Sequence, residues 1–295
     1  MQVNAGQGFK GLWDAFCGMM RLNLDGQKIT GAYSSDDNSS ILGTQKRNRV
    51  DFRYKEGNGT EGEGVFVLSE DGKSFTGKWR QDASQKWKAW NGPRVAPQAG
   101  KSCLIVLEAN WVTSLNEKDY SFGDVLKVYF NRFKNVEVRH RYFTGVKSLE
   151  KWLWQSQFIA EPVYLSISTH GTKKGVSVNS EVIDQEVFIK EIKSAPNIKL
   201  LHFAACLIME GEVPQKILAS KPIARFPISG YTTSVDWTQS AVLEILYFSL
   251  IFENKMSPVK AVEQVKKNFP SGNSKVKGSV FQNAGFKILS PLVKE

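Results

Sequence analysis

The second half of the chain alternates strand patterns with helical patterns, and this alternation limits its possible folds more than any other feature. From Lys101 onward, near-continuous apolar runs, such as 102–110 and 198–206, are separated by segments with helical spacing, such as 148–159. Apolar runs of this kind are typical of strands that are buried on both faces. The pattern therefore predicts one α/β domain over residues 101–295, with a parallel sheet and helices on both of its faces.

Residues 1–93 follow a different pattern, with short alternating runs that are rich in glycine and aromatic residues. An internal repeat aligns residues 18–33 with residues 64–79 without gaps, and each copy reads as strand, Asp-Gly turn, strand. Asp-Gly is a strong hairpin signal because both residue types tolerate the positive φ of a tight turn. We predict a small antiparallel β module, either a sheet or a partly closed barrel, with Asp25-Gly26 and Asp71-Gly72 at equivalent turns.

The β module needs a core, and aromatic residues are the best candidates for it. We expect the core to contain Trp13, Tyr33, Phe52, Tyr54, Phe66, Phe75 and Trp79. The stretch from Trp90 to Lys101 holds two prolines and two glycines without periodicity, which indicates a boundary region, and we place the linker at residues 94–100.

Composition narrows the class of protein. The net charge is +10, but Lys and Arg are scattered and the densest cluster, 46–49, is only four residues long. A solvated basic surface is therefore expected, and nucleic-acid binding is not predicted because no recognisable module is present. The longest apolar stretch, 241–252, contains Glu244 and is too short to span a membrane.

The three cysteines indicate a reducing environment. Their number is odd, their spacings are wide, and the sequence contains no CxxC, so neither a disulfide scaffold nor a zinc site is expected. The N-terminus lacks the basic and apolar regions of a secretory signal. We therefore expect a cytoplasmic protein that requires no metal and no cofactor.

A histidine and a cysteine follow two predicted strands of the sheet. His170 comes directly after the strand that begins at Val163, and Cys206 ends the next one, "LLHFAAC". Neighbouring parallel strands lie about 5 Å apart, so their carboxyl ends can bring these side chains together. A thiol beside an imidazole makes a nucleophile and base pair, because a nearby imidazolium favours the thiolate. Gly171 has no side chain, so its N–H can join that of Cys206 in an oxyanion hole.

These motifs resemble those of the caspase-like (clan CD) cysteine peptidases. "SISTHG" and "LHFAAC", each at the end of a strand and separated by a helix, look most like the bacterial CHAT branch. The resemblance covers about residues 101–295 and implies a caspase-like parallel-sheet sandwich that follows the β module. It also implies a thiol protease in which Cys206 attacks a scissile amide and His170 transfers the proton to the leaving amine.

Three residues are candidates for substrate binding. Asp236 follows the strand after the one that bears Cys206, and it resembles by position the acidic residue with which relatives select a basic P1 side chain. The alternative is that Asp236 caps the helix beginning near Thr238. Trp237 forms a pocket wall or simply packs, and Glu108, at the end of the first strand, is a second acidic candidate. Structural roles are expected for His202, His140, Cys17 and Cys103.

The leading hypothesis is a cytoplasmic cysteine endopeptidase that cleaves a protein or peptide substrate. Such peptidases act in bacterial defence or programmed cell death, and the β module would then bind a regulatory protein partner. The alternative is a catalytically inactive caspase-like scaffold that serves in protein interactions. No membrane association is expected in either case.

Overall fold

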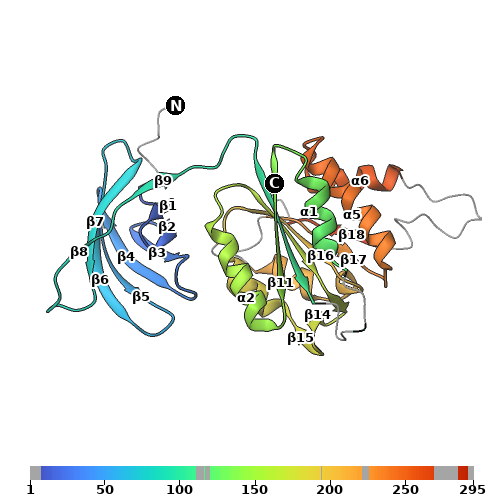
Figure 1. Ribbon diagram of the computed structural model, residues 1–295, viewed down its shortest axis with the longest axis horizontal. Helices are drawn as coiled ribbons and strands as arrows, with labels where there is room; N and C mark the ends of the chain where they lie inside the picture. The colour runs from blue at the N-terminus through green and yellow to red at the C-terminus, as the bar shows by residue number, and fades with distance from the viewer. Residues whose placement is uncertain are drawn as a thin grey trace, which may run out of the picture. The chain divides into compact units, whose positions relative to one another are not determined.

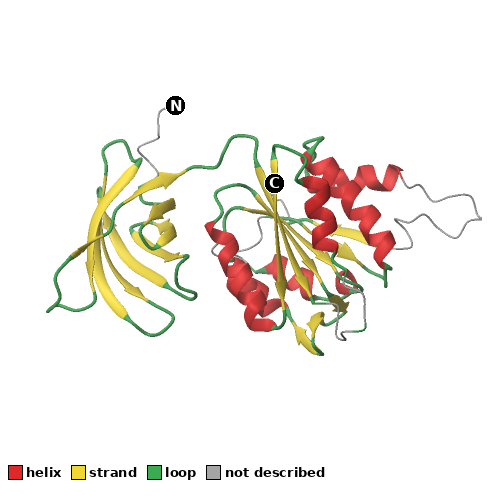
Figure 2. Ribbon diagram, in the orientation of Figure 1, coloured by secondary structure: helices red, strands yellow, loops and turns green. Residues whose placement is uncertain are grey.

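The chain forms two compact units, Met1–Gln98 and Ala99–Glu295, and their division lies within the range predicted as the linker. The computed structural model describes residues 8–110, 116, 120–193, 195–220, 226–268 and 285–291. Strands and turns build the described part of the first unit, whereas the second combines strands with helices (Figure 2).

The first unit is a closed antiparallel barrel, drawn from blue to cyan in Figure 1. Its strands are β1 (Gly11–Ala15), β2 (Gly18–Asp25), β3 (Lys28–Tyr33), β4 (Ser40–Lys46), β5 (Arg49–Lys55), β6 (Glu61–Leu68), β7 (Ser74–Arg80), β8 (Lys88–Ala89) and β9 (Gly92–Val95). They follow the order β6-β5-β4-β3-β2-β1-β9-β7-β8, and β6 also pairs with β7. This last pairing closes the ring and leaves only the short β8 outside it.

The internal repeat corresponds to two hairpins of the barrel. Asp25-Gly26 connects β2 to β3, and Asp71-Gly72 connects β6 to β7. Gly26 and Gly72 have φ values of 57° and 68°, which is the left-handed region that glycine enters without steric penalty. The two Asp-Gly pairs therefore occupy equivalent turns, as the repeat predicts.

Aromatic side chains fill the barrel. All seven residues predicted for the core lie in it, Trp79 at its partly buried margin. Trp90 also belongs there: it is 2 % exposed, and its ring packs edge-on against Phe52 and Phe66. The interpretation of 90–101 as a boundary region was therefore wrong at its start, because β9 pairs with β1 and β7 and contributes to the closure of the barrel.

The second unit is built on a six-stranded sheet with the order β11-β10-β12-β16-β17-β18. Its strands are β10 (Ser102–Ala109), β11 (Val136–Phe143), β12 (Val163–Ser168), β16 (Ile198–Ala204), β17 (Ile228–Tyr231) and β18 (Phe286–Leu289). The first five are parallel, as predicted, but β18 runs antiparallel to β17. The prediction missed β18, which is only four residues long.

Helices cover both faces of this sheet (Figure 1). The helices are α1 (Phe122–Phe130), α2 (Val146–Gln155), α3 (Gln185–Ile192), α4 (Val213–Ala219), α5 (Trp237–Phe252) and α6 (Pro258–Asn268), with short 3-10 turns at Ser156–Phe158 and Ile208–Glu210. Side chains of α2, α3 and α4 belong to the core on one face, and those of α1, α5 and α6 to the core on the other. Within the described residues, no helix combines the length and apolar character that a membrane span requires.

A buried polar cluster lies under α5. His202 on β16 and Glu244 on α5 are both fully buried, with 3.3 Å between Nε2 and Oε1. The Tyr231 hydroxyl donates to the same Glu244 oxygen at 2.9 Å, and His202 Nδ1 lies 2.9 Å from Ser229 Oγ. His202 therefore has the structural role that the sequence suggested, although it packs through polar contacts as well as apolar ones.

Candidate active site

His170 and Cys206 follow neighbouring strands at one edge of the parallel sheet. β12 ends at Ser168 and β16 at Ala204, and these two residues are paired in the register. The Thr169 N–H donates to the Ala204 carbonyl at 3.3 Å, which continues the pairing past the strand ends. His170 is exposed and Cys206 is partly exposed. Both side chains therefore belong to the same edge and are accessible from solvent.

Gly171 lies directly against the Cys206 segment. A Cβ built on Gly171 would lie 2.9 Å from the backbone nitrogen of Cys206 and 2.9 Å from the Cβ of Ala205, and would come even closer to the Cys206 carbonyl oxygen. Such separations are shorter than real Cβ contacts. Only glycine therefore lets the His170-Gly171 backbone lie directly against the backbone of Cys206.

The hairpin that begins at His170 also packs against the segment that follows Cys206. His170–Thr172 is strand β13, which pairs with β14 (Gly175–Val178), and β14 pairs with β15 (Glu181–Ile183) in a small antiparallel sheet. A Cβ on Gly211 would collide with the backbone of Lys173, so the end of this hairpin packs against the turn that follows Cys206. This small sheet of three- and four-residue strands was not predicted from the sequence.

The thiol of Cys206 lies against the loop that follows β17. Its Sγ donates to the carbonyl of Val235 at 3.8 Å, and the N–H of Leu207 donates to the carbonyl of Thr233 at 3.2 Å. Leu207 has a φ of 61°, so the chain turns sharply just after the cysteine. Sequence reasoning missed Thr233 and Val235 because they contribute backbone carbonyls, which leave no mark in residue type.

The other two cysteines are in different surroundings. Cys17 is part of the barrel core and Cys103 is buried in β10. Burial raises the pKa of each thiol to about 12, because a thiolate is poorly solvated there. Their structural interpretation therefore agrees with their positions, and Cys206 is the cysteine with solvent access.

Asp236 and Trp237 directly follow the carbonyl that contacts the thiol. Asp236 is exposed, and its carbonyl accepts the first hydrogen bond of α5, from Ser240 N at 3.1 Å. Trp237 is 42 % exposed, and its ring packs edge-on against Tyr120 and Phe122 at 5.9 and 6.0 Å between centroids. Asp236 thus holds the position of a helix cap on a segment that borders Cys206, so both of its predicted roles remain open.

Glu108 does not occupy a position that suits a pocket wall. It is fully buried, and its carboxylate accepts hydrogen bonds from Ser121 Oγ at 2.6 Å and from the N–H groups of Phe122 and Gly123 at the start of α1. It also forms an ion pair with His140, at 2.9 Å between Oε2 and Nε2. The carboxylate therefore anchors α1 to β10 and β11 inside the domain.

The charges of this pair follow from their contacts. Burial raises the pKa of the Glu108 carboxyl, but His140 and the three hydrogen-bond donors outweigh burial, so the pKa lies below its ordinary value. Burial lowers the pKa of the His140 imidazole, but Glu108 and Asp124 outweigh it, so that pKa lies above its ordinary value. Each charged form is stabilised by its partner.

Comparisons with known proteins find similar folds among solved structures. No protein-family model matches the chain, and a search of curated proteins finds no match. Among solved structures, the chain is similar to the crystal structure of caspase-1 from Spodoptera frugiperda, with 13 % sequence identity and a TM-score of 0.41. The alignment covers 65 % of this chain and 88 % of that one, and the likeness concerns the fold alone.

Proposed function

We propose that the protein is a cysteine endopeptidase of the caspase-like type, closest to the CHAT branch, with Cys206 as nucleophile and His170 as its acid–base partner. The observation that carries the proposal is the close approach of Gly171 to the Cys206 backbone. It supports a site in which a solvent-accessible imidazole and thiol lie on adjacent segments just past the carboxyl ends of parallel strands, where α/β folds place their ligands.

The chemistry proceeds in two balanced stages. In the first, Sγ of Cys206 forms a bond to the carbonyl carbon of the scissile amide, His170 delivers the thiol proton to the leaving nitrogen, and the C–N bond breaks. In the second, water attacks the resulting thioester, and a carboxylic acid and the free thiol are released. The backbone N–H groups of Gly171 and Cys206 would stabilise the oxyanion in both stages. No step requires a metal or a cofactor.

The Val235 carbonyl is the group that Cys206 Sγ contacts. Sγ donates a hydrogen bond to this carbonyl at 3.8 Å. A substrate that binds along the loop after β17 would displace this contact and release the thiol to His170. Trp237 at the start of α5, together with Tyr120 before α1, offers an exposed aromatic surface beside that loop for a substrate side chain.

Asp236 is proposed to select the residue on the amino side of the scissile bond. Its carboxylate follows Val235 by one position, so a basic P1 side chain bound beside the thiol could form a charge-assisted hydrogen bond with it. The same carboxylate would repel an acidic P1 residue. This assignment makes the substrate a protein or peptide that is cleaved after Lys or Arg.

Cleavage of an unbiased peptide library, read by mass spectrometry, tests the proposal. The wild-type chain is expected to cleave a defined subset of peptides, and Cys206→Ala and His170→Ala each to lower the rate by about a thousandfold or more. Because both residues have solvent exposure, circular dichroism and the thermal midpoint should stay unchanged. Equal cleavage by wild type and Cys206→Ala would rule out the assignment. A wild-type chain that cleaves nothing and whose Cys206 fails to react with thiol-directed peptide electrophiles would instead favour the inactive scaffold.

A further inference from the structure

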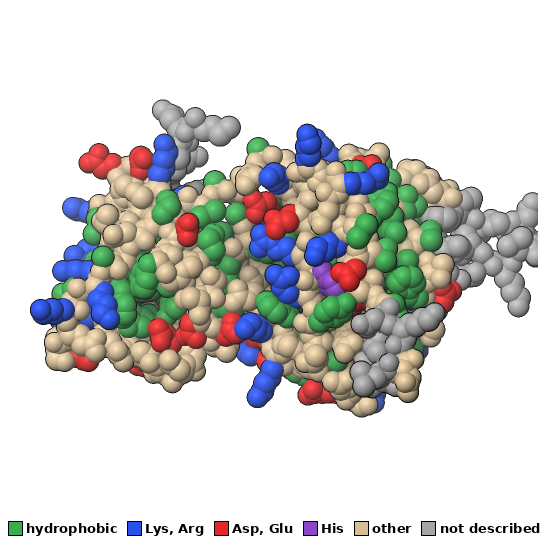
Figure 3. Space-filling model, in the orientation of Figure 1, with side chains coloured by type: hydrophobic (Ala, Val, Ile, Leu, Met, Phe, Trp, Pro, Cys, Tyr) green, Lys and Arg blue, Asp and Glu red, His purple; other side chains and the backbone are tan. Residues whose placement is uncertain are grey.

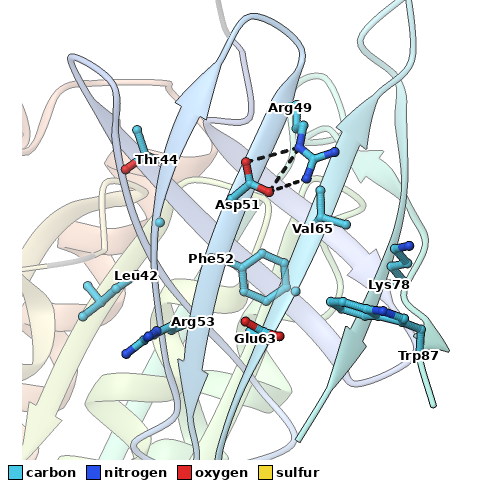
Figure 4. Close-up of a pocket in the computed structure, with 12 residues that line it drawn as sticks. Leu42, Thr44, Arg49, Asp51, Phe52, Arg53, Glu63, Val65, Lys78 and Trp87 are labelled. Atoms are coloured by element: carbon cyan, nitrogen blue, oxygen red, sulfur yellow. Dashed lines mark hydrogen bonds and ion pairs between the residues drawn. The ribbon is translucent and has the colours of Figure 1, made fainter. Parts of the chain in front are cut away.

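The outer face of the barrel carries a hollow that has no part in the proposed peptidase site. It has a volume of about 610 Å³ and is lined by side chains of β4, β5, β6 and β7 together with Trp87 (Figure 4). The interior of the barrel is filled by its aromatic core, and strand β5 alternates strictly between buried and exposed positions. Three of the four exposed positions of β5, which are Arg49, Asp51 and Arg53, line the hollow.

Two rows of paired residues cross the hollow. One row runs Leu42, Arg53, Glu63, Arg80, and the next runs Thr44, Asp51, Val65, Lys78. Trp87 stands beside them, with Lys78 Nζ 4.9 Å and Arg80 Cζ 4.4 Å from its ring centroid. Leu42 is 57 % exposed and Trp87 is 40 % exposed, so the hollow offers apolar contact at both sides.

The side chains that line the hollow have a net positive charge. Both of its carboxylates already have cationic partners: Asp51 lies 2.6 Å from Arg49 Nη2, and Glu63 accepts from Arg80 Nε at 2.7 Å. Arg53 and Lys78 add two further positive charges to the lining. Lys and Arg side chains are also visible beside hydrophobic ones on this unit in the space-filling view (Figure 3). An anionic ligand with an apolar part fits this arrangement.

We propose that the hollow binds an acidic, extended peptide segment of a partner protein. A peptide can place carboxylates at two separate points, whereas a nucleic-acid strand is charged at every unit and would meet Asp51 and Glu63. Arg53 and Lys78 are two strands and two residues apart, which corresponds to roughly 12 Å between their backbones. An extended peptide spans about 13 Å over four residues, so acidic residues at positions i and i+4 match the two cations. An apolar residue between them would lie over β6, where Val65 lines the hollow.

Fluorescence anisotropy with the full chain and short labelled peptides tests this site. The probe contains Glu at i and i+4 with Leu between them, and the comparison peptides place both Glu residues side by side or replace them with Lys. The wild-type chain is expected to bind the first probe at least about tenfold more tightly than either comparison peptide. Arg53→Gln combined with Lys78→Gln should weaken that binding about tenfold or more, and Trp87→Ala should also weaken it.

A matched control separates local contacts from overall charge. Lys10→Gln combined with Lys73→Gln also removes two positive charges from the barrel, but neither residue lines the hollow. This variant should keep the wild-type affinity, and all variants should keep the wild-type thermal midpoint. Equal weakening by the two double variants would overturn the site, as would a wild-type chain that does not distinguish the peptides. Tighter binding of an oligothymidylate, lost in Arg53→Gln/Lys78→Gln, would show that the hollow serves nucleic acid instead.

Discussion

At the scale of single residues, Gly171 gives the proposed site its most specific prediction. Gly171→Ala would place a methyl group against the backbone of Cys206, so the His170 segment would have to move away from the thiol. Displacements of about 1 Å at a reacting centre lower rates roughly a hundredfold, and we expect a loss of that size in kcat/KM. Measuring peptide cleavage and thermal stability together separates displacement from unfolding.

Gly145→Ala is the matched control for this substitution. Gly145 has a φ of 177°, and a Cβ there would meet no atom within 4 Å. It should therefore leave both cleavage and stability close to wild type. Full activity in Gly171→Ala would mean that His170 and Cys206 do not depend on this close approach.

Asp236 has two candidate roles, which a conservative substitution separates. Asparagine caps a helix about as well as aspartate but carries no charge, so Asp236→Asn should keep the stability of wild type. If the carboxylate recognises a basic P1 side chain, the same change should lower kcat/KM for Lys or Arg substrates by about a hundredfold and affect neutral P1 residues less. An unaltered P1 profile in Asp236→Asn would leave the residue as a helix cap only.

At the residue scale, the candidate site residues could be chosen from the sequence by their chemistry and by their position at strand ends. His170, Gly171 and Cys206 were selected because they lie at or just after the ends of predicted buried strands, and the sheet brings those ends to one edge. Their catalytic role stays a prediction. Glu108 also lies at the end of a strand and was a candidate for substrate binding, but it is fully buried. Its carboxylate turns inward to bind the start of α1 and His140, and nothing in the local sequence distinguishes a strand-end carboxylate that anchors a helix from one that faces a substrate.

At the scale of elements, the Glu108–His140 pair should make the attachment of α1 depend on pH. The folded-state pKa of His140 is raised, so its contribution to stability is complete below its ordinary pKa of about 6.5 and is lost as pH rises through the raised value. The pKa of Glu108 is lowered, so its contribution is complete above about 4.5 and is lost as pH falls further. The pair therefore stabilises the fold most between these values.

Urea unfolding of wild type and His140→Gln at several pH values checks this prediction. The groups that face the imidazole are Glu108, Asp124 and the ring of Tyr142. We expect the wild-type advantage in the free energy of unfolding to be larger near pH 6 than near pH 9. Lys127→Gln, an exposed change on α1, should show no such trend. A difference between wild type and His140→Gln that is constant with pH would contradict the ion pair.

The parallel strands and the helices of the second unit could be predicted from sequence, and four of its short strands could not. Five parallel strands and six helices follow from apolar runs and helical spacing, because burial on two faces or on one stripe sets those patterns. Strands β13, β14, β15 and β18 have three or four residues each and were not predicted, whereas β17, which is also four residues long, was recognised from its apolar run. Their pairing depends on tertiary neighbours, such as β17 for β18.

At the scale of the whole molecule, the two units have separate cores, so they should unfold separately. Trp90 lies at the centre of the barrel's aromatic core, in contact with rings of Tyr33, Phe52 and Phe66. Trp90→Ala should lower the stability of the barrel by about 3–5 kcal/mol through lost burial and the cavity left behind. Calorimetry should show the transition of one unit shifted to lower temperature and the other unchanged. A uniform shift of the whole profile would mean that the units unfold as one.

The division into two units was visible in the sequence as a change of pattern, from glycine-rich alternating strands to strands alternating with helices. Closure of the barrel could not be predicted from the sequence. It depends on β9 pairing with both β1 and β7. β9 contains Gly92 and Pro93 and is followed by Pro97 and Gly100, a composition that is typical of a linker. A single strand contributed by a boundary segment leaves little periodic signal, although Trp90 beside it is a core residue by type.

The reactivity of Cys206 tests the central claim most directly. Each chain is treated with a limiting amount of iodoacetamide at pH 7, and the modified cysteines are identified by mass spectrometry over time. We expect Cys206 to be alkylated first in wild type, and about tenfold more slowly in His170→Ala, because a neighbouring imidazolium favours the reactive thiolate. Cys17 and Cys103 serve as internal controls, since burial holds their thiols protonated. Equal alkylation rates of Cys206 in wild type and His170→Ala would contradict the proposed pair.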